Sequence, residues 1–326
     1  MARSEKTMLD IPGCVIELSG EANPGKGEDA YGCFLDEDGC SFAVFDGCGG
    51  SGAQTYPCFD GKTGAYVAAR KCRDAYFKWY LHYLNERYVF TKANMAKNLS
   101  DAKEYFQNAL FACADFAAMQ DGVRENMMGS MVRSFPTTVS AILCDYYDEV
   151  FSVGFLWAGN SRGYVLNANG LAQITEDDIF GEGDALDNLR NDDSLSNLLN
   201  ADSDFSLRGL YYHLRLPVIL ITATDGCFDY LPSPMHFEDM LLSTMQASES
   251  YEEWRAKIND ILGKCSSDDY SIILGCFGFR SFAEMKRHFA KRQLYVRERY
   301  VLPLMDNYED KIDRLWQDYK PRYYRR

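Results

Sequence analysis

The 326-residue sequence lacks the features that would point to a membrane, a disulfide framework or a cluster of sulfur and nitrogen metal ligands. No run approaches the roughly 18 consecutive apolar residues of a membrane-spanning helix. The N-terminal stretch MARSEKTMLDIPG has no apolar core of the kind found in secretory signals. The eleven cysteines form no CxxC pair, and the four histidines are scattered without ligand spacing. We therefore expect free thiols, a reducing cytoplasm and no membrane partner.

Positive charge is scarce in most of the chain. The formal net charge is −14, with 34 Lys and Arg against 48 Asp and Glu, which argues against nucleic acid as a partner. The balance reverses at the C-terminal end, where residues 280–326 carry 13 basic and 7 acidic side chains, a net of +6. The preceding residues carry a net of −20. We predict a domain over residues 1–279 and a basic helical extension over residues 280–326.

Short runs rich in β-branched and aromatic residues recur, separated by Gly, Asp, Asn or Pro, and are typical of strands. They cover 31–35, 40–45, 138–144, 150–157, 162–166, 217–224 and 271–277. Apolar side chains near helical spacing predict helices over 63–88, 101–120 and 236–262. Strands that meet in hairpins, with helices inserted in pairs, favour a layered α+β domain over alternating βαβ units.

Two segments stand apart from these elements. Residues 176–210 are polar and acidic, and an excursion of this length between strands is usually functional or mobile. In the extension, a helix is predicted to break at Pro303 and to be followed by a second helix. One face of that second helix is apolar and contains Ile312, Leu315, Trp316 and Tyr319. This spacing favours packing on the domain or on a second copy, and the alternative is a docking arm for another protein.

Carboxylates stand at the ends of three apolar runs. Asp46 follows FAVF, Asp225 follows VILITAT, and the pair Asp268 and Asp269 precedes YSIILG. One Asp-Gly step is more often a hairpin turn, but four glycines within six residues after Asp46 exceed what a turn needs. Carboxylates gathered at one edge of a sheet repel one another unless a cation neutralises them, and oxygen ligands select Mg²⁺, Mn²⁺ or Ca²⁺ over zinc. Two such ions about 3.5–4 Å apart, bridged by one Asp, form the arrangement that hydrolyses phosphate esters.

Five segments match a known family in order, over roughly residues 15 to 278. GKGEDAYG resembles a Glu-Asp motif, FAVFDGCGG an Asp-Gly-x-Gly-Gly motif and FPTTVSAIL a Gly-Thr-Thr strand. WAGNSRGYVL with QITEDD resembles a Gly-Asp-Ser-Arg strand, and TATDGCFDYL with SSDDYSIIL the last acidic motifs. The ordered set resembles the metal-dependent serine/threonine protein phosphatases (the PPM or type 2C family), in particular bacterial members. The resemblance implies a central antiparallel β-sandwich flanked by pairs of helices, in α-β-β-α layers.

The resemblance also implies roles for individual residues. Asp46 would bridge two Mn²⁺ or Mg²⁺ ions, and Gly47 would offer its carbonyl to one of them. Asp225 and Asp268 would be ligands of the other ion. Glu28 would hold a water on the ions.

Several positions depart from the family pattern. The phosphate-binding Arg falls on Pro24, and Lys26 is the nearest basic substitute, although an ammonium is a point charge and not a bidentate fork. Asp229 matches a ligand of a weaker third ion, whose other ligand, the Asp of the Gly-Asp-Ser-Arg motif, is Asn160 here. Cys48 stands where many eukaryotic members have a His. Core hydrolysis is retained in this interpretation, while substrate positioning and third-ion binding differ.

Other catalytic interpretations match less well. GEANPGKG, residues 20–27, approaches a P-loop but ends in Gly27 instead of Ser or Thr and leads into strand-like residues. An aspartyl-phosphate phosphatase would require an acid where Cys48 stands, and none of the cysteines has the Arg six positions later that a cysteine phosphatase needs. The alternative left open is a metal-binding pseudophosphatase that acts as a signalling scaffold. The intact set of Asp46, Asp225 and Asp268 argues against it.

We therefore predict a cytoplasmic, Mn²⁺- or Mg²⁺-dependent phosphoprotein phosphatase that hydrolyses phosphoserine and phosphothreonine by direct attack of water activated between two ions. Its partners would be phosphorylated substrates of a Ser/Thr kinase, with no nucleic acid and no membrane, and a protein bound at the C-terminal extension is a further alternative. Because residues 1–279 carry a net charge of −20, we expect basic residues around the favoured phosphosite.

Overall fold

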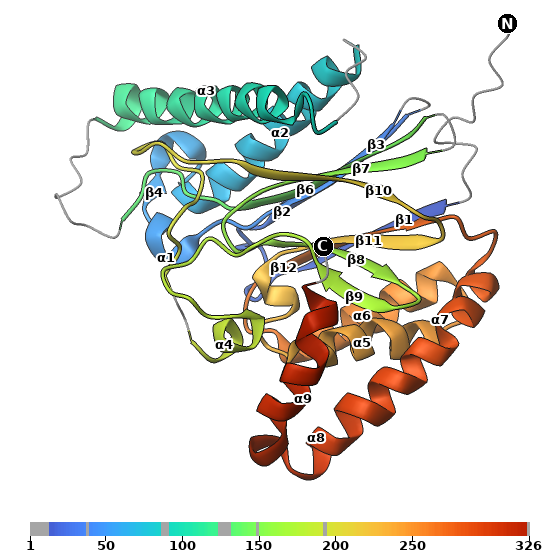
Figure 1. The fold of residues 1–326 in the computed structure, drawn as a ribbon. Helices are drawn as coiled ribbons and strands as arrows, with labels where there is room; N and C mark the ends of the chain where they lie inside the picture. Colours follow the sequence, from blue (N-terminus) through green and yellow to red (C-terminus); the bar gives the residue numbers. More distant parts are fainter. Residues whose placement is uncertain are drawn as a thin grey trace, which may run out of the picture.

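The fold is a sandwich of two antiparallel sheets with helices on both outer faces (Figure 1). The computed structural model describes residues 13–36, 39–85, 91–122, 132–147, 150–191 and 194–324. One sheet has the strand order β10-β7-β6-β3-β2, and the other has the order β1-β12-β11-β8-β9. The layered α+β sandwich predicted from the sequence is confirmed.

The first sheet consists of Ala30–Leu35 (β2), Cys40–Phe45 (β3), Val139–Tyr147 (β6), Val150–Ala158 (β7) and Arg208–Leu214 (β10). The first four were predicted, because each carries a dense run of apolar or β-branched residues. β10 was not predicted, and its first three residues fall within the excursion predicted over 176–210; the strand lies at the sheet edge, partly exposed, and carries no continuous apolar run. β6 and β7 pair as a hairpin, from Val139 with Ala158 to Tyr147 with Val150.

The second sheet consists of Gly13–Gly20 (β1), Arg162–Asn167 (β8), Gly170–Gln173 (β9), Val218–Ala223 (β11) and Tyr270–Phe277 (β12). The central strands β11 and β12 are buried along their whole length, which explains their continuous apolar sequences. β1 and β9, at the two edges, were not predicted. The first strand pairs with the last one, from Gly13 opposite Phe277 to Gly20 opposite Tyr270.

Two long helices, Gly64–Asn85 (α2) and Met95–Asp121 (α3), lie over the first sheet (Figure 1). They bury aromatic side chains against it, and the ring centroids of Phe106 on α3 and Phe45 on β3 are 6.3 Å apart. Between β3 and α2 the chain forms the single turn Gly49–Gly52 (α1) and a small ribbon of Thr55–Tyr56 (β4) and Lys62–Thr63 (β5). The helices predicted over 63–88 and 101–120 are confirmed where the chain is described, with residues 86–88 outside the described part, and α3 begins six residues earlier than predicted.

The second sheet is covered by Pro234–Gln246 (α5), Tyr251–Cys265 (α6) and the C-terminal helices (Figure 1). The single helix predicted over 236–262 is wrong. The chain breaks between α5 and α6 because Ser250 begins a new helix, its side chain accepting a hydrogen bond from the Glu253 backbone N–H at 3.2 Å. Ser followed three residues later by Glu is a helix-start signal that the apolar periodicity hid.

The extension forms Phe282–Val296 (α7), a π-helical segment Arg297–Val301, Leu302–Asp306 (α8) and Tyr308–Tyr323 (α9). The break predicted at Pro303 is wrong. Pro303 occupies the first turn of α8, where a backbone N–H has no helical partner to lose, and the chain turns instead at Asn307, which caps α9. Within the described residues no helix combines the length and apolarity needed to cross a bilayer.

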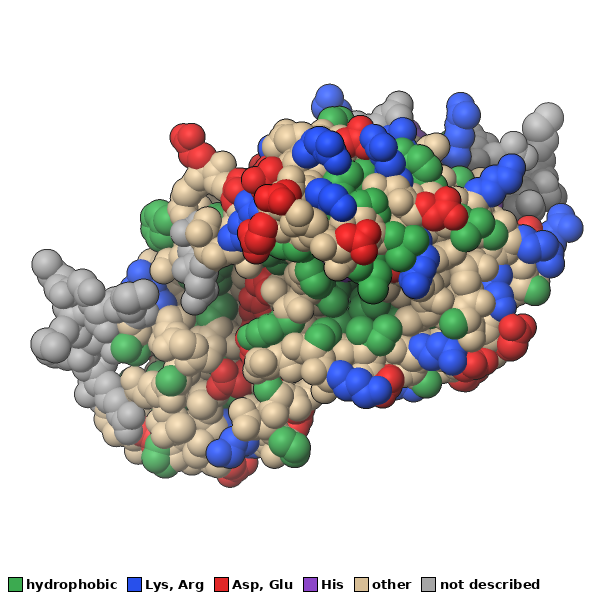
Figure 2. All heavy atoms as spheres, turned by 90° about the horizontal axis from the view of Figure 1, so that it is seen from below, with side chains coloured by type: hydrophobic (Ala, Val, Ile, Leu, Met, Phe, Trp, Pro, Cys, Tyr) green, Lys and Arg blue, Asp and Glu red, His purple; other side chains and the backbone are tan. Residues whose placement is uncertain are grey.

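The apolar face of α9 packs on the domain, as the sequence favoured. Its side chains are buried in one hydrophobic cluster with residues of β11 and β12: Ile312, Leu315, Trp316 and Tyr319. That face is therefore covered, and a protein partner of the extension would have to use another surface. On the face seen in Figure 2, Lys and Arg side chains lie interspersed with Asp and Glu. The boundary at 279/280 stays a prediction.

Candidate functional site

In the first sheet, strand register brings acidic residues together. β2 begins beside the end of β3, because Ala30 pairs with Phe45. Glu28 and Asp29, which precede β2, and Asp46, which follows β3, therefore lie at the same end of the sheet.

The second sheet repeats this arrangement. The end of β11 lies beside the start of β12, because Ala223 pairs with Ile272. Asp225 begins a single 3₁₀ turn directly after β11, and Asp268 and Asp269 directly precede β12. The predicted ligands of the two ions thus come from both sheets.

Hydrogen bonds join these two sheet ends into one rim. The carboxylate of Asp269 accepts the backbone N–H of Ala22 at 2.8 Å and that of Glu28 at 2.7 Å. The Thr224 hydroxyl donates to the Asp29 carboxylate at 2.8 Å. Asp269 is thus engaged in holding the 21–29 loop, and the ligand role of Asp268 stays a prediction.

The Thr-Thr and Ser-Arg motifs hold the backbone of Asp46. The Asp46 carbonyl accepts hydrogen bonds from the Thr138 N–H at 2.8 Å and the Thr137 hydroxyl at 2.7 Å. The Asp46 N–H in turn donates to the Thr138 hydroxyl oxygen at 3.3 Å, and that hydroxyl lies 2.6 Å from the Ser161 hydroxyl. Residues distant in sequence therefore fix the end of β3.

Glycines after Asp46 make room for Glu28. The Thr63 hydroxyl donates a hydrogen bond to one oxygen of Glu28, and the other oxygen lies against Gly49 so closely that a Cβ at Gly49 would collide with it. A Cβ at Gly47 would come within 2.8 Å of the Glu28 backbone oxygen. The glycine-rich stretch is thus required by close approach and not only by a turn.

Burial and mutual repulsion raise the pKa values of the gathered carboxyls. Burial, followed by the charges of Asp225, Asp29, Asp268 and Glu28, raises the pKa of Asp46 well above its ordinary value. Burial, followed by the charge of Asp268, raises the pKa of Asp225 to about 6. Asp46, Asp225 and Asp268 therefore lie within electrostatic range of one another. They are not drawn together tightly: among the described residues no group of three or more His, Cys, Asp or Glu side chains has the geometry of a metal site.

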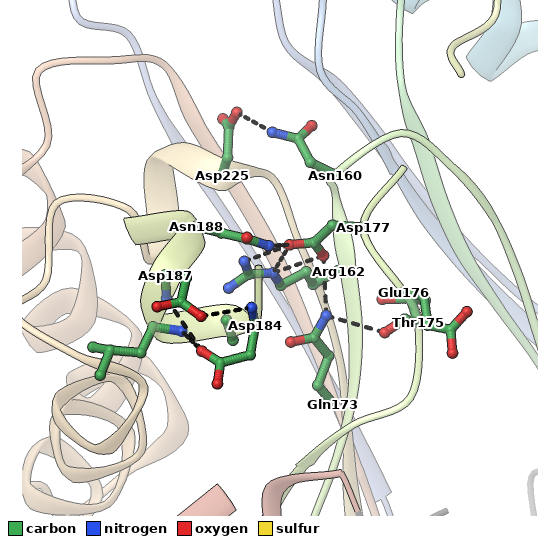
Figure 3. A network of polar contacts seen from close by, with 12 residues as sticks. Asn160, Arg162, Gln173, Thr175, Glu176, Asp177, Asp184, Asp187, Asn188 and Asp225 are labelled. Carbon is green, nitrogen blue, oxygen red and sulfur yellow. Dashed lines mark hydrogen bonds and ion pairs between the residues drawn. The ribbon is translucent and has the colours of Figure 1, made fainter. Parts of the chain in front are cut away.

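The donor set nevertheless fits a hard divalent cation. The side chains at the rim offer oxygen ligands, and burial together with neighbouring carboxyls raises the pKa values of Asp46 and Asp225, which a bound cation would counteract. Asn160 donates its amide N–H to the Asp225 carboxylate at 2.9 Å, whereas its buried Oδ1 has no hydrogen-bond partner among the described residues (Figure 3). A buried oxygen without a donor beside crowded carboxylates is what a cation would satisfy.

Three predicted residues, Lys26, Asp229 and Asp268, are exposed, and the sequence missed two others. Lys26 lies on the exposed turn of the 21–29 loop, and Asp229 lies on the exposed end of the turn that begins at Asp225. Arg70 of α2 was missed: its guanidinium donates to the backbone carbonyls of Glu28 and Gly27, each at 3.2 Å. Asp29, whose carboxyl pKa burial raises well above the ordinary range, was quoted in the Glu-Asp motif without a role. Arg70 is the seventh residue of α2, and this position gave no signal in one sequence.

The raised pKa values imply that the metal-free protein loses stability between about pH 4 and pH 7. Asp225 keeps its proton to about pH 6 in the folded state but releases it near 3.8 when unfolded, so the folded state binds more protons in this window and stability falls as pH rises. The free-energy cost from this group is at most about 3 kcal/mol. We expect Asp225→Asn to raise the melting temperature at pH 7.5 in chelator and to flatten the profile, measured by thermal unfolding at pH 5.0 and 7.5.

A matched substitution in this experiment is Asp260→Asn, which removes an exposed carboxylate on α6 that pairs with Lys264 at 2.6 Å. It should leave the pH profile unchanged. An Asp225→Asn profile as steep as that of the unsubstituted protein would contradict the electrostatic account.

Comparison with known proteins identifies the fold. No family model and no curated protein matches the sequence. The catalytic domain of the serine/threonine phosphatase PstP in complex with two manganese ions matches with a TM-score of 0.54 at 16% identity, covering 82% of this chain and 98% of that one. PstP/Ppp from Mycobacterium tuberculosis matches with a TM-score of 0.55 at 13% identity, covering 82% of this chain and 100% of that one. Stp1 from Staphylococcus aureus matches with a TM-score of 0.56 at 18% identity, covering 82% of this chain and 94% of that one. The resemblance found in the motifs is confirmed as a shared fold.

Proposed function

We propose that the chain is a divalent-metal-dependent phosphatase that hydrolyses phosphoserine and phosphothreonine in proteins. One observation carries the proposal: half-buried carboxylates of both sheets lie at one rim, near enough for their charges to raise one another's pKa values. The rim belongs to a fold shared with serine/threonine phosphatases, one of them solved with two manganese ions. Phosphoryl transfer needs electrostatic stabilisation and positioning more than covalent chemistry, and this kind of site supplies both.

Each rim residue has a task in this proposal. Asp46, held by its backbone at the end of β3, would be the ligand shared by two Mn²⁺ or Mg²⁺ ions, with the Gly47 carbonyl on one ion and Asp225 and Asp268 on the other. Glu28, held by the Thr63 hydroxyl, would hold and orient the attacking water. Two bound ions lower the pKa of a water molecule and neutralise the phosphoryl oxygens. Direct attack by water needs no nucleophilic side chain.

The substrate phosphate would not be bound by a bidentate arginine in this site. Arg70 is engaged with two backbone carbonyls and stacks 3.4 Å over the Tyr66 ring, so it serves to hold the Glu28 segment. Lys26 on the exposed turn would supply the positive charge for the substrate phosphate, as a point charge. A third ion near Asp229 would bind weakly, because Asn160 is neutral and its amide is engaged by Asp225.

The test is Mn²⁺-dependent phosphate release from phosphoserine and phosphothreonine peptides. We expect turnover with Mn²⁺ or Mg²⁺ and none in excess chelator. Because the body of the chain is strongly acidic, peptides with basic flanks should be hydrolysed about tenfold faster, in kcat/KM, than the same peptides with acidic flanks, and the difference should shrink with salt.

The outcomes separate the alternatives. Mn²⁺ binding without turnover of any peptide would favour the metal-binding scaffold over the enzyme. Equal turnover of acidic and basic peptides would contradict the charge-based preference and leave the hydrolytic proposal intact.

A further inference from the structure

Asp184 links the C-terminal helix α9 to the short helix Ala185–Arg190 (α4), which lies within the polar excursion (Figure 1). One carboxylate oxygen of Asp184 caps α4 by accepting the backbone N–H groups of Leu186 at 3.0 Å and Asp187 at 3.2 Å. The other accepts the Trp316 indole N–H at 2.8 Å and the Lys320 ammonium at 2.7 Å. The side chain of Asp184 is 14% exposed and that of Lys320 is 37% exposed, so the bonds lie at the edge of the domain and are partly shielded from water. The two oxygens of one carboxylate thus join the two helices.

From α4 the network continues to the start of β8 (Figure 3). Asn188 donates its amide N–H to the Asp177 carboxylate at 2.8 Å. Asp177 also binds the Arg162 guanidinium in a bidentate pair at 3.0 and 2.6 Å, and it accepts the Gln173 amide at 3.0 Å. The side chains of Arg162 and Asp177 are 3% and 6% exposed. A buried pair of this kind depends on its surrounding donors to hold its geometry.

The start of β8 in turn contacts the Asp225 turn in two ways. Asn160, two residues before Arg162, donates to the Asp225 carboxylate (Figure 3). The Arg162 guanidinium lies 4.0 Å over the ring of Phe228, which belongs to the same turn.

A second route from α9 uses aromatic packing alone. The Tyr164 ring of β8 lies 6.3 Å from the Tyr323 ring of α9 and 6.3 Å from the Phe228 ring. Tyr324, which follows α9, accepts the backbone N–H of Ala185 at 2.7 Å. Polar and aromatic contacts therefore run from the last helix of the chain to the turn that carries Asp225.

We propose that α9 is a positioning element of the candidate active site, in which Trp316 and Lys320 fix Asp184 and, through α4 and Asp177, hold segment 159–163 and the Asp225 turn in place. The effect of α9 on catalysis rests on the proposed phosphatase function, whereas its effect on the mobility of segment 159–163 does not. In this proposal the extension acts on the site through α9, which is packed on the domain. It acts neither as a detached arm nor by covering the site.

The experiment compares Trp316→Phe/Lys320→Met with Asp313→Asn in the full-length chain. The double variant removes both donors to Asp184 and leaves its cap of α4 intact. The control breaks another ion pair between α4 and α9, that of Arg190 with Asp313 at 2.8 Å. These side chains are 40% and 73% exposed, so the pair contributes little to stability. Lys320→Arg keeps a charged donor and serves as the conservative variant.

Hydrogen exchange is the primary measurement, made without metal. Loss of two hydrogen bonds to a charged group should raise amide exchange about tenfold over residues 184–191 and, if the network transmits, over 159–163, where Gly159 N–H donates to Asp178 at 3.1 Å. The control and Lys320→Arg should match the unsubstituted chain. Calorimetric titration should show Mn²⁺ binding weakened by about threefold or more in the double variant only.

Faster exchange confined to residues 184–191, with 159–163 unchanged, would overturn the inference and make α9 a purely local clamp of α4. Unchanged Mn²⁺ affinity in a double variant that binds the ion would overturn it as well. If the unsubstituted chain neither binds Mn²⁺ nor hydrolyses phosphopeptides, the proposed function fails, and exchange at 159–163 still decides whether α9 positions that segment.

Discussion

Replacing Asp46 by Asn should reduce Mn²⁺-stimulated hydrolysis of p-nitrophenyl phosphate by about 10³-fold or more, since several kcal/mol of transition-state stabilisation depend on the ions that this residue would bridge. The substitution keeps the shape of the side chain and removes one charge from a crowded rim. The backbone bonds from Thr137 and Thr138 to Asp46 do not involve the altered atoms. The loss of activity should therefore come from the missing ligand and not from misfolding.

Thermal unfolding of the same variant tests whether the loss of activity comes from misfolding. Burial and four neighbouring carboxyls raise the pKa of Asp46, so its charge at neutral pH opposes folding. In chelator at pH 7.5, Asp46→Asn should melt at the same temperature as the unsubstituted chain or higher, while calorimetry detects weaker Mn²⁺ binding. Asp225→Ala should also lose ion binding, and Asp260→Asn should lose neither binding nor activity. Substantial Mn²⁺-dependent hydrolysis by Asp46→Asn would end the two-ion proposal.

Arg292→Met should destabilise the protein by about 3–5 kcal/mol, because it leaves Glu238 as an uncompensated charge in the core. Glu238 of α5 is fully buried and accepts two hydrogen bonds from Arg292 of α7, both at 2.7 Å. It also accepts the Tyr319 hydroxyl at 2.6 Å and the Leu171 N–H at 3.1 Å. Thermal unfolding should show a melting temperature lower by roughly 10 °C.

A double variant distinguishes a lost pair from lost packing. Arg292→Met with Glu238→Gln removes the stranded charge and should recover more than half of the stability. Arg299→Met, which breaks an exposed pair with Asp318 at 3.2 Å, should change the melting temperature by about 2 °C or less. A truncated chain of residues 1–279 with unchanged thermal unfolding would contradict this account, because it would show that Glu238 needs no partner from the extension.

The sequence predicted those parts of the fold that depend on dense local patterns. The buried strands β3, β11 and β12 carry continuous apolar runs, so they were correctly predicted. The edge strands β1 and β10 were missed because they are only partly buried and have weaker patterns, whereas β9 is mostly buried but only four residues long. The break between α5 and α6 was missed because the apolar periodicity continues over the whole segment, and the helix-start signal consists of Ser250 and Glu253 alone.

Some residues of the candidate site could be predicted from local patterns, and others could not. Asp46 and Asp225 follow apolar runs, and the ordered motifs indicated that they meet, which the register of both sheets supports. Arg70 and Asp184 act through contacts across 42 and 136 positions, to Glu28 and Lys320. No periodicity or spacing in a single sequence encodes such pairs, so their roles emerge only from tertiary structure.

The pairing of β1 with β12 has a consequence for how the chain is made. β1 precedes β12 by about 250 residues, yet within the described sheet it pairs with β12 alone, and Glu238 of α5 gains Arg292 and Tyr319 only from still later residues. Contacts of such long sequence separation slow folding and leave apolar surface open meanwhile. The growing polypeptide therefore carries an unfinished second sheet until residues 270–277 have been made, and chains released before that point would be prone to aggregate.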